Sequence, residues 1–223
     1  MASLTYAIEV ERVRRNLAEV RAEVEAAAAR VRRDPAQVQV LAATKYVHPA
    51  ELPKLAQAGI ELVGENRAQE LEAKAGAYGE LFTWDFIGTL QSRRVPLIVP
   101  HVRLIHSVAS ESALRVLARH LDGARPGLGV LIEVNVAGEE GKAGVLPAQL
   151  DELIELSPVP VEGLMTMPPM TDRPEQSRRW FAALRELAQE RGMGTLSMGS
   201  SQDYAVAVEE GATIVRLGSR LYR

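Results

Sequence analysis

Lys45 is the residue whose type and position point most directly to chemistry. It follows the apolar run 38–44 and precedes a helical pattern, so we expect it at the carboxyl end of a buried strand. Barrels and open parallel sheets bind their ligands at that end. Partial burial of the ammonium there would favour the neutral amine, which can attack a carbonyl carbon. A lysine that extends from the strand end into water is the alternative interpretation.

Two later loops are rich in groups that bind phosphate. Gly199-Ser200-Ser201 is predicted to open a helix, where backbone N–H groups and hydroxyls can face an anion. Gly218 allows a close approach of the backbone, and Ser219 adds a donor. Each loop alone is typical of ordinary turns, but parallel barrels often bind phosphate in this region. Together with Lys45 they indicate a phosphorylated aldehyde, and pyridoxal 5′-phosphate (PLP), held as a Schiff base, meets both requirements.

The elements that must position these residues alternate between strand and helix patterns, which is typical of parallel βαβ units. Strands are expected near residues 38–44, 60–63, 83–88, 103–107, 129–136, 160–166, 194–198 and 212–217. Helices are expected near residues 49–58, 66–75, 90–99, 110–122, 147–157, 174–191 and 201–210, after an opening helix over about residues 4–32. Eight strands predict a single α/β domain over residues 1–223, a (β/α)8 TIM barrel in which the opening helix replaces the eighth outer helix.

Composition excludes several classes of protein. The 223 residues are 47% hydrophobic, enough for one substantial core. A formal net charge of −3 gives no electrostatic reason to expect nucleic acid or an anionic membrane as partner. The chain has no cysteine, which excludes disulfides, thiolate ligands and thiol nucleophiles, and its histidines lack metal-binding spacing. Neither a signal peptide nor a long apolar segment is recognisable, so we expect a cytoplasmic protein without a membrane or metal partner.

Seven motifs resemble, in order, those of the pyridoxal phosphate homeostasis protein family. They are Ala43-Thr44-Lys45, Val63-Gly64-Glu65-Asn66, Phe86-Ile87-Gly88-Thr89-Leu90-Gln91-Ser92, Ile105-His106-Ser107, Gly163-Leu164-Met165, Leu196-Ser197-Met198-Gly199 and Val215-Arg216-Leu217-Gly218. The resemblance spans nearly the whole chain. It implies a PLP-binding barrel of fold type III, like the N-terminal domain of alanine racemase, with the cofactor on Lys45.

The resemblance also implies the other cofactor contacts and a role. The contacts fall on Asn66, Ser201, Arg216, Gly218 and Ser219, with Arg216 facing the ring nitrogen. The implied role is to carry or buffer PLP in vitamin B6 homeostasis. Two of these residues also have structural interpretations, because Asn66 could cap a helix and Arg216 could pair with Glu65 or Asp203.

Several positions depart from the family pattern. Asp85 stands where histidine is common, Thr89 replaces a frequent proline, and Ser200 replaces a usual methionine. Arg93-Arg94 stands for a frequent Asn-Lys pair, and the chain ends at Leu221-Tyr222-Arg223 where many members continue. These departures bear on the shape of the pocket and on the carboxyl-terminal contacts, whereas Lys45, Asn66, Ser201 and Arg216 are retained.

The surroundings of Lys45 favour a carrier over an enzyme. A racemase needs a base on each face of the substrate α-carbon. No cysteine is available, and Tyr46 is expected to point away from Lys45, as neighbouring strand residues do. Because the chain ends five residues after Gly218, no second domain is expected to close the barrel mouth. We therefore expect a monomer that passes PLP to PLP-dependent apoenzymes, with a weak amino-acid racemase and a cofactor-free Schiff-base aldolase as alternatives.

Overall fold

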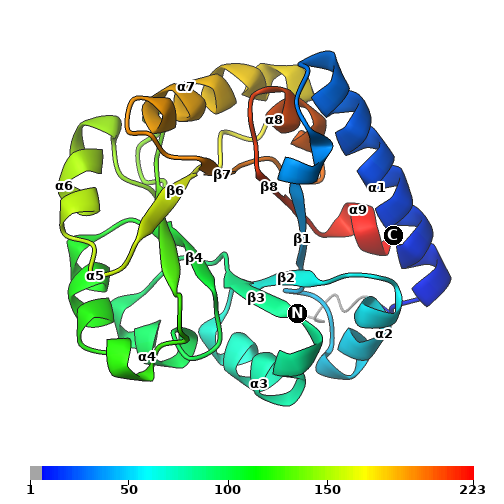
Figure 1. Cartoon of the computed structure of the whole chain (residues 1–223), viewed down its shortest axis with the longest axis horizontal. Helices are drawn as coiled ribbons and strands as arrows, with labels where there is room; N and C mark the ends of the chain where they lie inside the picture. The colour runs from blue at the N-terminus through cyan, green and yellow to red at the C-terminus, as the bar shows by residue number, and fades with distance from the viewer. Residues whose placement is uncertain (1–6) are drawn as a thin grey trace.

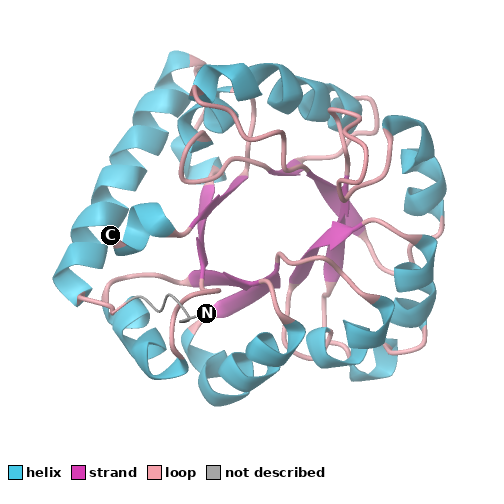
Figure 2. Ribbon diagram, turned by 180° about the vertical axis from the view of Figure 1, so that it is seen from behind, coloured by secondary structure: helices cyan, strands magenta, loops and turns pink. Residues whose placement is uncertain are grey.

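The computed structural model describes residues 7–223 and shows a closed barrel of eight parallel strands in chain order, surrounded by helices (Figures 1 and 2). This confirms the predicted fold. The strands are β1 (Gln39–Ala43), β2 (Leu62–Glu65), β3 (Thr83–Phe86), β4 (Leu104–Val108), β5 (Gly129–Glu133), β6 (Val161–Met165), β7 (Thr195–Ser197) and β8 (Ile214–Leu217). β1 pairs with both β2 and β8, which closes the barrel.

Helices follow the strands along the chain. They are α1 (Val10–Arg30), α2 (Leu52–Gln57), α3 (Ala68–Tyr78), α4 (Val95–Ile98), α5 (Glu111–Ala118), α6 (Leu150–Glu155), α7 (Arg178–Gln189), α8 (Tyr204–Glu209) and α9 (Ser219–Tyr222). Short 3-10 segments are η1 (Pro35–Gln37), η2 (Pro49–Glu51), η3 (Gly79–Leu81), η4 (Ser92–Arg94), η5 (Leu121–Gly123), η6 (Pro147–Gln149) and η7 (Pro174–Ser177). No helix within residues 7–223 is long and apolar enough to cross a membrane.

Helix boundaries differ from the sequence-based prediction, and most helices are shorter than their expected ranges, as α4 (Val95–Ile98) is within residues 90–99. α1 begins at Val10 instead of residue 4, and residues 4–6 of the predicted helix lie outside the described residues. α8 begins at Tyr204, because the residues before it form a turn in which the Ser200 backbone N–H donates to Asp203 Oδ1 (2.7 Å). The four-residue helix α9, which follows β8, was not predicted. The last two differences both lie at the predicted phosphate loops.

Side chains alternate along each strand between the barrel interior and the surrounding helices, as the strand period requires. On β4, for example, Ile105 belongs to the large core between barrel and helices, whereas Leu104 faces inward. The apolar part of the interior is a small cluster of Leu41, Leu104, Leu131, Met165 and Ile214. Buried polar side chains occupy other strand positions, namely Asp85, His106, Glu133 and Ser197. The barrel is therefore filled, and the polar set lies within strands that lead to its mouth.

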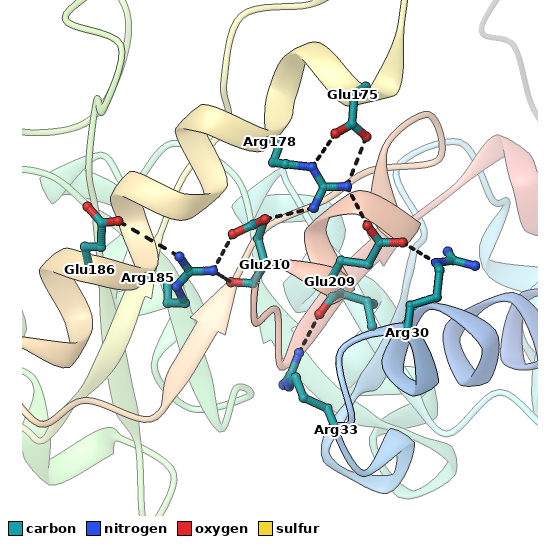
Figure 3. A network of polar contacts seen from close by, with 9 residues as sticks. Arg30, Arg33, Glu175, Arg178, Arg185, Glu186, Glu209 and Glu210 are labelled. Atoms are coloured by element: carbon teal, nitrogen blue, oxygen red, sulfur yellow. Dashed lines mark hydrogen bonds and ion pairs between the residues drawn. The ribbon is translucent and has the colours of Figure 1, made fainter.

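α1 takes the place of an eighth outer helix, as predicted, and lies beside α8 and α9 (Figure 1). A network of ion pairs joins α1, η7, α7 and α8 (Figure 3). Arg178 contacts Glu209 and also pairs with Glu210 at 2.8 Å, while Arg30 of α1 reaches the same Glu209 at 2.5 Å. Arg33 donates to the carbonyl oxygen of Val208 at 2.6 Å. This network holds α1 beside α8 on the outside of the barrel.

Candidate functional site

A cavity of about 900 Å³ opens at the carboxyl ends of the strands, a volume typical of small-molecule sites. Its wall contains all six residues that the sequence predicted to contact a cofactor: Lys45, Asn66, Ser201, Arg216, Gly218 and Ser219. They come from the loops after β1, β2 and β7, from β8 itself and from the start of α9. The parallel barrel brings these segments together because all its strands end on the same face.

Lys45 lies two residues beyond the end of β1, and its side chain is exposed at the cavity. This exposure favours the alternative interpretation, a lysine that extends from the strand end into water. Its Nζ lies 5.0 Å from the centroid of the Tyr46 ring, and Tyr46 lines the same cavity. The expectation that Tyr46 points away is wrong, because β1 ends at Ala43 and strand alternation no longer applies.

Lys45 differs from the other three lysines of the chain, because each of those pairs with a glutamate. Lys54 pairs with Glu51 at the surface (2.9 Å), and Lys142 pairs with Glu139. Lys74 pairs with Glu65 in the interior (2.7 Å). Among residues 7–223, no carboxylate forms an ion pair with Lys45. Its amine is thus both accessible and uncommitted to a carboxylate.

The buried pair of Lys74 and Glu65 supports the backbone that follows β1 and β2, next to Lys45 and Asn66. The Lys74 side chain is 1% exposed and that of Glu65 is 0% exposed. Lys74 Nζ also donates to the carbonyl oxygen of Thr44 (3.0 Å), and Thr44 Oγ1 donates to Glu65 Oε2 (2.9 Å). The other carboxylate oxygen of Glu65 accepts from the backbone N–H of Asn66 (2.9 Å). Sequence reasoning missed Lys74, because a lysine within a helix is ordinarily solvated.

Asn66 is half-buried and does not cap a helix, so that structural interpretation is wrong. α3 begins at Ala68, and its N-cap Arg67 makes no side-chain cap. The Asn66 side-chain oxygen is buried without a hydrogen-bond partner among the described residues. Such an atom is costly to leave unsatisfied, so its place in the cavity wall fits a residue that binds a ligand. The Asn66 carbonyl also approaches Gly88 so closely that a Cβ there would lie 2.0 Å from the oxygen.

The two predicted phosphate loops meet through Ser201. Its Oγ accepts hydrogen bonds from the backbone N–H groups of Gly218 (3.2 Å) and Arg220 (3.5 Å). Ser200, by contrast, donates its hydroxyl to Asp203 (3.0 Å), so it is held within its own turn. A Cβ at Gly218 would meet only Ala43, at 3.9 Å. Packing within the protein therefore leaves open space at Gly218, on the cavity wall.

Arg216 enters the cavity from β8 and is held by neutral groups. Its Nη1 donates to Ser197 Oγ, and its Nη2 donates to the carbonyl oxygen of Thr166 (3.0 Å). Burial lowers the pKa of Arg216 to about 10, although the charges of Glu133 and Asp203 oppose this shift. The guanidinium thus remains a cation at neutral pH. The alternative pairing with Glu65 is wrong, because Glu65 is engaged by Lys74 and Thr44.

Asp85 and His106 lie inside the barrel, and neither has any exposed surface. His106 Nδ1 lies 2.8 Å from Ser197 Oγ, and its Nε2 lies 3.1 Å from Asp85 Oδ2. Burial lowers the pKa of His106, although Asp85 opposes this shift. Burial raises the pKa of Asp85, but hydrogen bonds from His106 and Arg103 outweigh that effect and bring it below its ordinary value. His106 is therefore a neutral interior residue and not part of the cavity wall.

Comparison with known proteins agrees with this geometry. Residues 8–223 match the family model of the alanine racemase N-terminal domain. The pyridoxal phosphate homeostasis protein of Aquifex aeolicus is 40% identical over 217 residues, which cover 92% of this chain and 95% of the relative. The Escherichia coli K12 protein of the same name is 34% identical, covering 93% and 94% respectively. The chain belongs to the pyridoxal phosphate homeostasis protein family.

Solved structures of similar proteins extend this assignment. PipY of Synechococcus elongatus, a structure with PLP bound, is 31% identical and superposes with a TM-score of 0.79 over 95% of this chain and 100% of that chain. D-threonine aldolase from Filomicrobium marinum has a TM-score of 0.72 but only 15% identity, and the match covers 63% of its length. The second comparison shows the shared barrel fold alone. The family predicted from the seven motifs is confirmed.

The buried His106 is expected to make the stability of the folded protein depend on pH. Its pKa in the folded protein is below 6.5, its ordinary value, so the unfolded chain binds more protons as the pH falls below about 6.5. The free energy of unfolding should therefore fall with pH, by at most about 1.4 kcal/mol per pH unit for this one proton. Urea unfolding measured between pH 7.5 and 4.5 checks this expectation.

The variant His106→Asn isolates this contribution, because an amide does not titrate. Glu133 acts with the opposite sign, since burial raises its pKa and the folded protein binds its proton more readily as the pH falls. The unfolding free energy of His106→Asn should consequently decline less steeply than that of the wild type below pH 6.5. Equal slopes for the two proteins would contradict the assignment of a neutral, buried His106.

Proposed function

We propose that this protein binds PLP covalently through Lys45 and serves as a carrier or buffer of the cofactor. The proposal rests on the state of the Lys45 amine, which is exposed in the cavity and forms no ion pair with a carboxylate in residues 7–223. Family membership and the bound cofactor of PipY support the same conclusion. When bound, PLP supplies an aldehyde that condenses with amines and a ring that withdraws electrons from the attached carbon.

The cavity wall offers a suitable group for each part of the cofactor. Lys45 Nζ would form the covalent bond with the aldehyde carbon, with release of one water molecule. Ser201, Gly218 and Ser219 would hold the phosphate through hydroxyl and backbone N–H donors. The unsatisfied side-chain oxygen of Asn66 and the cation of Arg216 would contact the ring. An arginine facing the ring nitrogen disfavours a proton there, so the ring would withdraw electrons less strongly.

The accessibility of Lys45 favours a carrier. An exposed amine can exchange the aldehyde with water and with dissolved amines, which allows the cofactor to leave for an apoenzyme. Tyr46 favours the alternative of a weak racemase, because its ring lies in the same cavity near Lys45 and its hydroxyl could move a proton. We propose the carrier, and the two functions differ in what they do to an amino acid.

An exchange experiment separates the two functions. The PLP-loaded protein is incubated with L-alanine in deuterated water, and α-deuterium and D-alanine are measured. A carrier should produce essentially none, whereas an enzyme would turn over at roughly 1–1000 per second. The same preparation should restore the activity of a PLP-requiring apoenzyme. Production of D-alanine at an enzyme-like rate that disappears in Tyr46→Phe would establish the racemase instead.

We expect the protein to act as a monomer in the cytoplasm, with PLP-dependent apoenzymes as acceptors. Sedimentation at several protein concentrations tests the monomer. A colourless protein that added PLP cannot colour would instead point to the cofactor-free aldolase.

A further inference from the structure

A continuous chain of hydrogen bonds runs through the barrel interior and ends at Arg216. Arg103 donates to both carboxylate oxygens of Asp85 (3.0 and 2.9 Å), and Asp85 contacts His106 Nε2 (3.1 Å). His106 Nδ1 contacts Ser197 Oγ (2.8 Å), and Ser197 Oγ accepts from Arg216 Nη1. Asp85, His106 and Ser197 come from β3, β4 and β7 and have no exposed surface. These hydrogen bonds therefore connect the neighbouring strands β3 and β4 with the neighbouring strands β7 and β8.

The partners determine the direction of every hydrogen bond in this chain. Asp85 is an ionised carboxylate and can only accept, so His106 must carry its proton on Nε2. Because burial keeps His106 neutral, Nδ1 is unprotonated and accepts from the hydroxyl of Ser197. The Ser197 oxygen is then left with lone pairs for Arg216. The carboxylate of Asp85 thus fixes the proton of His106, and His106 in turn orients the Ser197 hydroxyl oxygen that accepts from the Arg216 guanidinium.

Asp85, His106 and Ser197 have the residue types of a nucleophilic Ser-His-Asp triad, but the geometry does not allow that chemistry. Ser197 has no exposed surface, so no substrate carbonyl can reach its oxygen. That oxygen is also engaged by Arg216. The same contacts that exclude a nucleophile are suited to holding the guanidinium in one orientation.

The arrangement holds Arg216 without neutralising it. Its direct partners are the Ser197 hydroxyl and the Thr166 carbonyl, both uncharged. The charge of Asp85 is balanced by Arg103, which binds both carboxylate oxygens and is one-third exposed at the other end of the chain. Glu133 and Asp203 also act on Arg216, but neither forms an ion pair with it in residues 7–223. Most of the positive charge therefore remains available to the cavity.

We propose that Asp85, His106 and Ser197 are positioning residues, which hold Arg216 as an unneutralised cation against the cofactor. This inference rests on the proposed function, because it assumes that PLP bound to Lys45 presents its ring to Arg216. Arg103 supplies the charge that balances Asp85 in the barrel interior.

The test measures the absorbance of the PLP-loaded protein as a function of pH. A fixed cation disfavours protonation of the nearby cofactor and lowers the midpoint pH of its spectral change. Arg216→Met removes the charge and should raise this midpoint. Ser197→Ala and His106→Phe do not remove the charge of Arg216, but each interrupts the hydrogen bonds that link Asp85 to Arg216. Both variants should therefore also raise the midpoint pH. His106→Asn keeps an amide oxygen that can accept from Ser197 but loses the contact with Asp85, so its midpoint should lie between those of the wild type and His106→Phe.

Leu104→Ala serves as the matched control, because Leu104 faces the same interior from the same strand as His106 but makes no hydrogen bond in the chain. It should destabilise the fold without moving the midpoint. Chain-breaking variants that bind PLP with the wild-type midpoint, or an equal shift in Leu104→Ala, would overturn the inference. If His106→Phe does not fold, Ser197→Ala decides. An unchanged midpoint in Arg216→Met would also overturn the inference, whereas a wild-type protein that binds no PLP would remove the proposed function on which it rests.

Discussion

Replacing Lys45 with alanine is expected to abolish the PLP adduct that borohydride fixes to the wild-type protein. Borohydride reduces a Schiff base to a stable amine, and Lys45 is the lysine whose Nζ lies in the cavity. Mass spectrometry of the reduced, digested protein should place the label on Lys45 in the wild type and detect none in Lys45→Ala. Because the side chain is exposed, the free energy of unfolding should change by less than about 0.5 kcal/mol.

Lys54→Ala provides the control, since it removes a surface lysine that pairs with Glu51. That variant should retain the full adduct. A wild-type protein labelled mainly at Lys54 or Lys142 would contradict the assignment of Lys45. The same result would mean that the cavity is not the site of covalent binding.

Replacing Lys74 with methionine is expected to lower the free energy of unfolding by about 3–5 kcal/mol, because the substitution leaves Glu65 buried without its counter-charge. Both side chains are at most 1% exposed, so water cannot replace the lost partner. The carbonyl oxygen of Thr44 also loses a donor, directly beside Lys45. We therefore expect weaker PLP binding as well as lower stability. Urea unfolding and PLP titration measure the two effects.

Two further variants show whether the loss comes from the buried charge. Lys142→Met removes a half-exposed lysine that pairs with Glu139, and should change stability by less than about 1 kcal/mol. The double variant Lys74→Met with Glu65→Gln removes both charges and should recover part of the lost stability. A loss below about 1 kcal/mol in Lys74→Met would show that this pair does not hold the site together.

The sequence was sufficient to predict the barrel and six of the residues that line its cavity. All eight strands fall within a few residues of the expected ranges, because buried parallel strands are apolar runs that alternate with helical patterns. Lys45, Asn66, Ser201, Arg216, Gly218 and Ser219 all lie at the same mouth, as expected for residues at the carboxyl ends of parallel strands. Their actual contacts with the cofactor stay predictions until the variants are measured.

The helix and loop boundaries were less predictable, for reasons that are local. α8 begins three residues after Ser201 because Ser200 and Asp203 form their own hydrogen-bonded turn. Tyr46 reaches the cavity because β1 ends before it. A short polar turn in one case and the end of a strand in the other determine the local structure. The periodic pattern of apolar residues does not predict either feature.

Only the tertiary structure decided which buried polar groups meet. Lys74 appears in the sequence as an ordinary helical lysine, yet its position on α3 allows it to pair with the buried Glu65 next to the site. His106 contacts Asp85 on the neighbouring strand β3, whereas its contact with Ser197 joins β4 to β7, which are not neighbours in the closed barrel. Strand period determines which side chains point inward, but distances across the barrel are determined by its closure and packing. The sequence alone therefore identified the wall of the site, whereas the structure revealed the interior that supports it.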